Sequence, residues 1–276
     1  MKPVKNYASA GALRRALEDR LHHAASTQQV DLARLRRQVA FDRLLARLFH
    51  SDEALWALKG GYAMELQLQV ARTTVDIDLT LPATLNLPSE AASANAIVRE
   101  MLQESAGVDL GDWFVYTIGA PMLELDAAPY GGARYPIECR MDGRIFSRFH
   151  LDVGIGDVVM EPLQKIRGQD WLGFAGIPSA TVRLIPKEQQ VAEKLHAYTL
   201  PRNTANSRVK DLVDLLLLIR SGDVSLEKLP EAIRMPFERR KTHAIPTQLE
   251  SPDKRQGCAA ATQRLSVRCT ASISNL

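Results

Sequence analysis

The stretch from Lys59 to Leu81, KGGYAMELQLQVARTTVDIDLTL, decides how we expect this chain to fold. It opens on two glycines, continues through a segment compatible with a helix, and ends in the alternating run VDIDL at residues 75–79. Apolar and polar residues that alternate with period two predict a half-buried β-strand. The stretch therefore predicts a turn, a helix and a strand in succession.

Two carboxylates lie two residues apart in this predicted strand. Successive strand residues point to opposite faces, so Asp76 and Asp78 leave the same face, with Cα atoms about 6.5–7 Å apart. Like charges at this separation resist ionising together, and a divalent cation removes the conflict. Carboxylate oxygens suit Mg²⁺ or Mn²⁺. The alternative is a pair of solvated acids on a half-exposed strand, because the pattern DxD is common.

A third carboxylate, Asp152, lies in a second alternating run between Arg144 and Val153. One predicted face carries Ile145, Phe149, Leu151 and Val153, and the other carries Arg148, His150 and Asp152, with Phe146 interrupting the polar face. If this strand neighbours the first, Asp152 completes a cage of three carboxylates. The alternative is a strand-end acid paired with Arg148 or another base.

Gly60 and Gly61 precede the helix that leads into the DxD strand. Glycine lets a triphosphate approach the backbone, and the amino end of a helix favours negative charge. A pair of glycines is also typical of a plain turn, so the position upstream of DxD is what favours a nucleotide site here.

The rest of the chain is predicted as helices at 8–50 and 94–106, a strand-rich part at 113–153, and helices at 186–200 and 207–221. Asp142-Gly143 between two strand-like runs predicts a two-residue hairpin turn. We expect the charged residues of the first helices to form a solvated face, with an RNA or partner surface as the alternative. The predicted divisions are 1–55 (helical segment), 56–165 (core), 166–250 (helical domain) and 251–276 (poorly ordered tail).

Composition is that of a soluble globular protein. The 276 residues are 46% hydrophobic and 24% charged, with a net charge of +3, which excludes disordered, collagen-like and coiled-coil classes and permits an anionic partner. The amino-terminal residues do not resemble a secretory signal, and the longest aliphatic run, residues 215–219, is too short for a membrane helix. We therefore expect no membrane partner, and three scattered cysteines without zinc spacing favour the cytoplasm.

Five motifs in order resemble the AbiEii toxin family of nucleotidyltransferases, within the polymerase-β-like superfamily. They are KGGYA at 59–63, RTTVDIDL at 72–79, LDV at 151–153, AEKLHA at 192–197 and RVKDLVDL at 208–215. The superfamily's usual Gly-Ser is Gly-Gly here. The resemblance implies an α/β (α+β) fold: a polymerase-β-like core with a mixed sheet, amino-terminal helices and a carboxyl-terminal helical region.

The resemblance also implies roles for individual residues. Metal ligands and catalytic residues would be Asp76, Asp78 and Asp152, which hold Mg²⁺ or Mn²⁺, and the nucleotide phosphates would contact Gly60, Gly61 and Arg72.

Lys194 and Asp211 would be catalytic residues of the helical half, which reach the triphosphate or order the site. The alternative for Lys194 and Lys210 is a solvated helix charge. Asp211 and Asp214 share a helix face, and Asp214 could simply cap or pair locally.

The implied activity is Mg²⁺-dependent transfer of a nucleoside monophosphate from a nucleoside triphosphate to an acceptor hydroxyl. The implied acceptor is RNA, at the 3′ end of tRNA, and the implied role is that of a toxin in a toxin–antitoxin or phage-defence system, restrained by an antitoxin. Two alternatives stay open: a catalytically degenerate binding module with this fold, and a DxD glycosyltransferase that uses nucleotide sugars.

Overall fold

The computed structural model describes residues 7–68, 73–82, 85, 87–125, 128–202 and 208–249. The chain divides into two compact units, Met1–Pro186 and Lys187–Leu276. The predicted poorly ordered tail at 251–276 lies outside the described residues, and so do Cys258 and Cys269. None of the described helices is long and apolar enough to cross a membrane.

The first unit is built on one mixed sheet, whose strands lie in the order β3-β5-β6-β2-β1-β8-β7, with β4 paired to β5. Two neighbouring pairs, β2 with β6 and β1 with β8, are parallel, and the others are antiparallel. The strands are β1 (Ala57–Lys59), β2 (Asp76–Pro82), β3 (Phe114–Ile118), β4 (Leu123–Glu124), β5 (Gly132–Met141), β6 (Arg144–Asp157), β7 (Gln164–Arg167) and β8 (Thr181–Leu184). The predicted mixed α/β sheet fold is thereby confirmed.

The described residues of this unit form four α-helices: α1 (Ala10–Gln28), α2 (Leu32–Leu48), α3 (Gly60–Gln67) and α4 (Ala91–Ala106). The side chains of Ser9 and Asp31 accept hydrogen bonds from the first turns of α1 and α2, which starts each helix at a normal capping residue. Strand β1 leads directly into α3, and β2 follows, so the predicted order of glycine turn, helix and DxD strand is confirmed.

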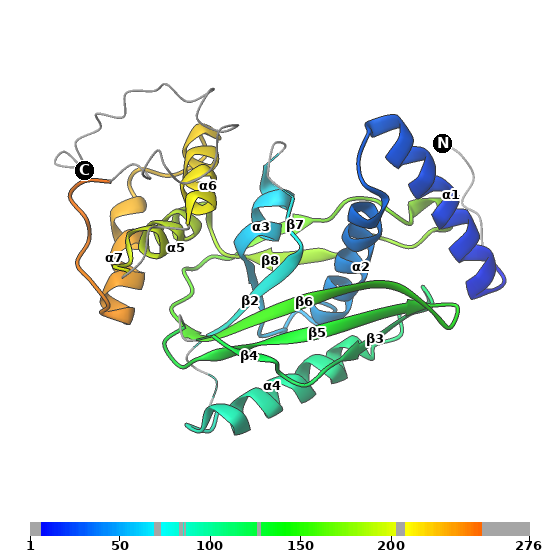
Figure 1. Cartoon of the computed structure of the whole chain (residues 1–276), viewed down its shortest axis with the longest axis horizontal. Helices are drawn as coiled ribbons and strands as arrows, with labels where there is room; N and C mark the ends of the chain where they lie inside the picture. Colours follow the sequence, from blue (N-terminus) through cyan, green and yellow to red (C-terminus); the bar gives the residue numbers. More distant parts are fainter. Residues whose placement is uncertain are drawn as a thin grey trace. The chain divides into compact units, whose positions relative to one another are not determined.

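The sheet has a core face and an opposite face. Tyr116 of β3 donates to a carbonyl of α2 and Tyr135 of β5 to a carbonyl of α4, so both helices cover the core face (Figure 1). Ile77, Leu151 and Val153 point to this face and are fully buried. Burial of this apolar layer is the main stabilisation of the unit, and it turns the alternate polar residues of β2 and β6 to the other side.

A hairpin joins β5 to β6, with Asp142 and Gly143 as its two-residue turn, as predicted. Both have positive φ, 55° and 67°, as a tight hairpin requires. The register shifts beyond the turn: Arg140 faces Ile145, but Cys139 faces Ser147, so Phe146 is an extra residue. Our assignment of Ile145 to the buried face was wrong, because this bulge buries Phe146 and exposes Ile145.

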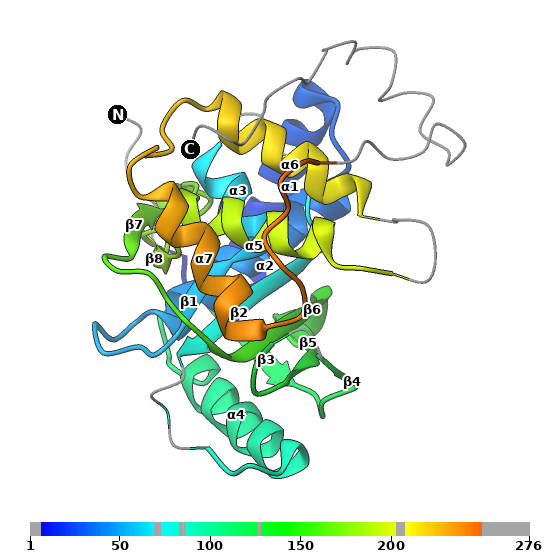
Figure 2. The same cartoon turned by 90° about the vertical axis from the view of Figure 1, so that its left-hand side faces the viewer.

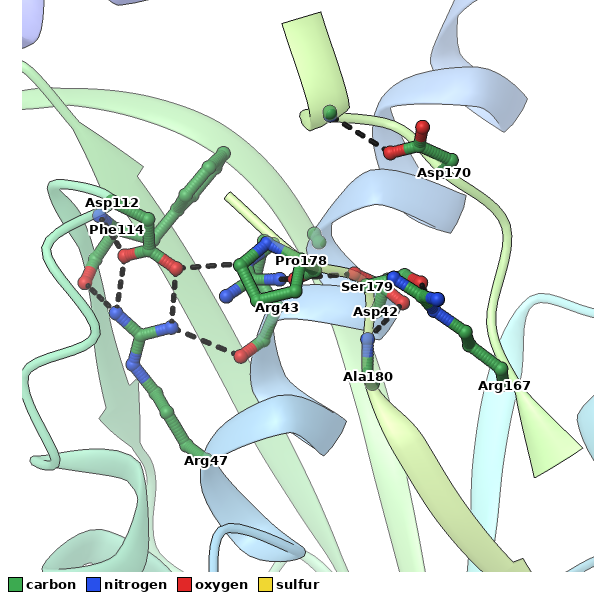
Figure 3. A network of polar contacts seen from close by, with 12 residues as sticks. Asp42, Arg43, Arg47, Asp112, Phe114, Arg167, Asp170, Pro178, Ser179 and Ala180 are labelled. Atoms are coloured by element: carbon green, nitrogen blue, oxygen red, sulfur yellow. Dashed lines mark hydrogen bonds and ion pairs between the residues drawn. The ribbon is translucent and has the colours of Figure 1, made fainter. Parts of the chain in front are cut away.

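A buried ionic network fastens α2 inside the first unit (Figure 3). Arg43 and Arg47 both bind the fully buried carboxylate of Asp112, at 2.8 Å from Arg43 Nε and 2.9 Å from Arg47 Nη1. Asp42 accepts from the backbone amide of Ala180, just before β8. The expectation that the charges of this helix form a solvated face was therefore wrong for these three residues, because distant segments supply their partners.

Residues 166–184, which we expected within the helical part, instead form β8, the end of β7 and a short 3₁₀ turn, η1 (Gly173–Ala175). In the second unit the described residues form the helices α5 (Lys187–Thr199), α6 (Val209–Arg220) and α7 (Leu229–Arg240). The predicted helices at 186–200 and 207–221 are confirmed as α5 and α6. Gly222, with φ of 73°, follows the end of α6 as expected of a glycine beyond a helix.

Candidate active site

The DxD motif forms the start of β2, and its two carboxylates leave the sheet on the side away from the core. Ile77, which lies between them, is fully buried, as is Leu79. Asp76 and Asp78 are in contrast partly exposed. We call this side of the sheet the carboxylate face.

Asp152 lies directly opposite Asp78. Strands β2 and β6 run parallel and side by side (Figures 1 and 2), with Asp78 paired to Asp152 and Asp76 paired to His150. Neighbouring strands are about 4.8 Å apart, so Asp152 presents its carboxylate next to that of Asp78. The structure thus brings the three predicted carboxylates together on one face, on two central strands.

Arg134 of β5 binds this carboxylate group, and sequence reasoning did not single it out. Its Nε and Nη2 donate to Oδ1 and Oδ2 of Asp152 at 2.7 and 2.8 Å, and Nη2 lies 3.5 Å from Oδ2 of Asp76. The hydrogen bond to Asp152, joined by the charges of Asp152, Asp76 and Asp78, raises the pKa of Arg134 above its usual value. Asp152 is therefore paired with a base, but with Arg134 rather than with Arg148.

A histidine of β6 faces the same carboxylates. Nδ1 of His150 lies 3.4 Å from Oδ1 of Asp76. In the part of the chain that the structure describes, no three His, Cys, Asp or Glu side chains are grouped as metal ligands. The carboxylate oxygens of Asp152 are instead occupied by the guanidinium.

Gly60 begins α3 next to the carboxylate face. Its φ is +67°, and a Cβ at this position would overlap the Asp78 side chain. Gly61 follows within the first turn and is buried. The glycine pair therefore does more than form a plain turn, because it lets the amino end of α3 lie against Asp78. Arg72, the other predicted phosphate contact, lies outside the described residues.

Lys194 and Asp211 are brought together within the second unit. Nζ of Lys194 on α5 lies 3.3 Å from Oδ1 of Asp211 and 2.7 Å from Oδ2 of Asp214, both on α6. Arg208 adds a third ion pair, 3.3 Å from Asp211. Lys194 is thus a partly buried, ion-paired residue and not a solvated helix charge, whereas Lys210 is exposed. Asp214 pairs with Lys194, which agrees with a local role.

A mixed sheet that carries a DxD strand, a third aspartate in register on the neighbouring parallel strand and a glycine-led helix is the arrangement expected of a nucleotidyltransferase. The chain belongs to the AbiEii family: the family model, described as the nucleotidyl transferase AbiEii toxin of a type IV toxin–antitoxin system, matches residues 43–266. The protein is therefore a nucleotidyltransferase of a toxin family, and membership implies an antitoxin partner.

The fold agrees with that of the first of two similar solved structures. The nucleotidyltransferase toxin MenT4 from Mycobacterium tuberculosis is 19% identical, with a TM-score of 0.54 over 78% of this chain and 68% of that one. JHP933 from Helicobacter pylori is 13% identical, with a TM-score of 0.43 over 79% of this chain and 84% of its own. No curated protein matches the chain.

Proposed function

We propose that this protein transfers a nucleoside monophosphate from a nucleoside triphosphate to an acceptor hydroxyl, with Asp76, Asp78 and Asp152 at the reacting centre. The observation that carries the proposal is the register of Asp78 and Asp152 on adjacent parallel strands, with Asp76 two residues away on the same face. Family membership supports the reaction class.

The three carboxylates fit a divalent cation by their chemistry. They form a set of hard oxygen donors on one face, and Mg²⁺ and Mn²⁺ prefer such donors. The repulsion among the three aspartates is the second argument, because a bound cation would relieve it further than the ion pairs of Arg134 with Asp152 and Asp76 do. When bound, the metal would supply neutralisation of the triphosphate charge and activation of the acceptor oxygen.

The chain's own residues have separable tasks in this reaction. An acceptor oxygen forms a bond to the α-phosphorus while the bond from that phosphorus to pyrophosphate breaks, and the hydroxyl proton passes to a carboxylate, for which Asp152 is the candidate. The amino end of α3, at Gly60 and Gly61, offers backbone amides to the phosphates. Lys194 of the second unit would contribute a positive charge, ordered by Asp211.

For the acceptor we propose RNA, at the 3′ end of tRNA, and for the cellular role a cytoplasmic toxin of a phage-defence or related toxin–antitoxin system. The support is the family's place in type IV toxin–antitoxin systems. A net charge of +3 permits an anionic acceptor.

The test is a transfer assay with purified protein, Mg²⁺, total tRNA and each α-labelled nucleoside triphosphate in turn. We expect label on RNA with the wild type and none with Asp76→Ala. Asp19→Asn is the matched control, because this exposed aspartate of α1 lies outside the motifs and its loss leaves the carboxylates intact. Label on protein would change the acceptor.

Absence of any transfer by folded wild-type protein would contradict the proposal and favour a degenerate nucleotidyltransferase fold that serves as a binding module. One observation makes this the second candidate: Asp152 is held by two hydrogen bonds to Arg134. The two functions differ in a direct measurement, because the degenerate module would bind its antitoxin without Mg²⁺-dependent binding of a nucleotide.

A further inference from the structure

Arg134 is built into the carboxylate face by its strand position. It lies directly opposite Asp152 in the β5–β6 pair, and the two residues make a two-pronged ion pair. The same guanidinium reaches Asp76 on the next strand at 3.5 Å. One arginine of β5 therefore binds carboxylates on two further strands, β6 and β2.

The pair differs from the other ion pairs on the same face. Arg140 and Arg148 both bind Glu138, a single acid that bridges two arginines and therefore has its charge fully compensated. Around Arg134 the numbers of bases and acids are reversed, because one guanidinium faces the three aspartates Asp76, Asp78 and Asp152. Three carboxylates close to one guanidinium are a set of hard oxygen donors that a divalent cation would favour.

Arg134 also uses the atoms that a metal would need. Both oxygens of Asp152 accept from it, and Oδ2 of Asp76 faces its Nη2. A cation bound by Asp152 and Asp76 would lie within a few ångströms of the guanidinium and would be repelled by it. The side chain is about 30% exposed, so it has room to leave without disturbing the apolar core.

We propose that Arg134 is the internal counter-ion of this site: it holds Asp152 and Asp76 while no metal is present and competes with the divalent cation for their oxygens. This inference rests on the proposed function, because it assumes that the carboxylates bind metal. Arg134 is a positioning residue under this proposal, and it sets the affinity of the free protein for metal.

The experiment measures binding of Mn²⁺ alone to the full chain, from the loss of the free Mn²⁺ signal in electron paramagnetic resonance. We expect Arg134→Gln to bind Mn²⁺ about tenfold more tightly than the wild type, because a competing positive charge is removed. Arg134→Lys, which keeps the charge but loses the two-pronged geometry, should fall between them. Arg148→Gln, an arginine of the same face that binds Glu138, should leave the affinity unchanged.

The possible failures are distinguishable. Equal or weaker Mn²⁺ binding by folded Arg134→Gln, with wild-type binding that depends on Asp78, would overturn the counter-ion role and leave the metal site standing. Binding that is absent from every variant, or that survives in Asp78→Asn, would overturn both this inference and the proposed metal function. Circular dichroism on each variant establishes that it is folded.

Discussion

Gly60 and Asp78 are in such close contact that position 60 has no room for a side chain. A Cβ there would overlap the Asp78 carboxylate, and the backbone has φ of +67°. The first residue of the glycine pair is therefore matched to the second residue of DxD, although 18 positions separate them in the sequence.

This relationship predicts that Gly60→Ala loses activity by displacing Asp78, in addition to a backbone cost of about 1–2 kcal/mol. The control is Gly143→Ala, because Gly143 also has φ of +67° but has open space around it. Both variants should lower the urea midpoint through this backbone cost, and Gly60→Ala should lower it more, because its Cβ also meets Asp78. Only Gly60→Ala should abolish nucleotide transfer. Equal activity of the two variants would contradict the role of this contact.

The order of elements around this contact could be predicted from sequence because each signal is local. Alternation predicts β2, a glycine pair predicts the turn before α3, and Asp142-Gly143 predicts the hairpin. Each of these depends on residues within a few positions of one another, so no tertiary partner has to be known.

The role of Arg134 could not be predicted in the same way. A hairpin continued without interruption from Met141 and Arg144 would set Arg134 opposite Leu151, on the buried face. The extra residue at Phe146 shifts the register by one, and Arg134 then faces Asp152. The broken alternation at Phe146 was the available signal, but its effect on the pairing of Asp152, six residues further on, depends on which strand takes the bulge.

The burial of Arg43 and Arg47 could not be predicted from the sequence either. Their shared partner, Asp112, is 69 and 65 residues away in sequence, and nothing in the helical pattern of α2 points to it. Helix periodicity reports which residues share a face, not which distant carboxylate meets them.

Asp112→Asn should therefore be strongly destabilising. The change leaves two buried guanidinium groups without their common carboxylate, and removing one partner from a buried ionic group costs about 3–5 kcal/mol. Urea unfolding measures the loss. Glu138→Gln is the control, because Glu138 also joins two arginines but at the surface, where solvent screens the charges. A similar fall in both variants would show that burial of the network contributes nothing.

Stability should also depend on pH through Asp42. Burial raises the pKa of Asp42 to about 6, from 3.8 in the unfolded chain. Between these values the folded state holds the proton and the unfolded state does not. The contribution of Asp42 to the free energy of unfolding therefore falls as pH rises from about 4 to 6. The shift corresponds to up to about 3 kcal/mol.

The measurement compares the free energy of unfolding of wild type and Asp42→Asn at pH 4 and pH 7. The variant cannot titrate at this position. From pH 4 to pH 7 its free energy of unfolding should therefore rise relative to that of the wild type by about 1–3 kcal/mol. A difference between the two proteins that is independent of pH would rule out Asp42 as the titrating group.

In the second unit, Asp214→Asn should weaken the packing of α5 on α6. Lys194 lies 2.7 Å from Asp214, whose side chain is almost completely buried, and the variant leaves the Lys194 ammonium with its longer ion pair to Asp211, at a cost of about 1–3 kcal/mol. Asp223→Asn is the matched control, because Asp223 binds Lys187 at the same distance of 2.7 Å but its side chain is 71% exposed. Thermal unfolding should show a lower midpoint only for Asp214→Asn.

Divalent metal should stabilise the folded protein if the carboxylate face binds it. A ligand at about 100 times its dissociation constant adds about 2.7 kcal/mol to the free energy of unfolding, so saturating Mn²⁺ should raise the unfolding temperature, and EDTA should reverse the shift. Asp78→Asn should lose both this stabilisation and nucleotide transfer, whereas Asp19→Asn should keep both. A shift that persists in Asp78→Asn would locate metal binding elsewhere in the chain and would remove the main physical support for a reacting centre at the register of Asp78 and Asp152.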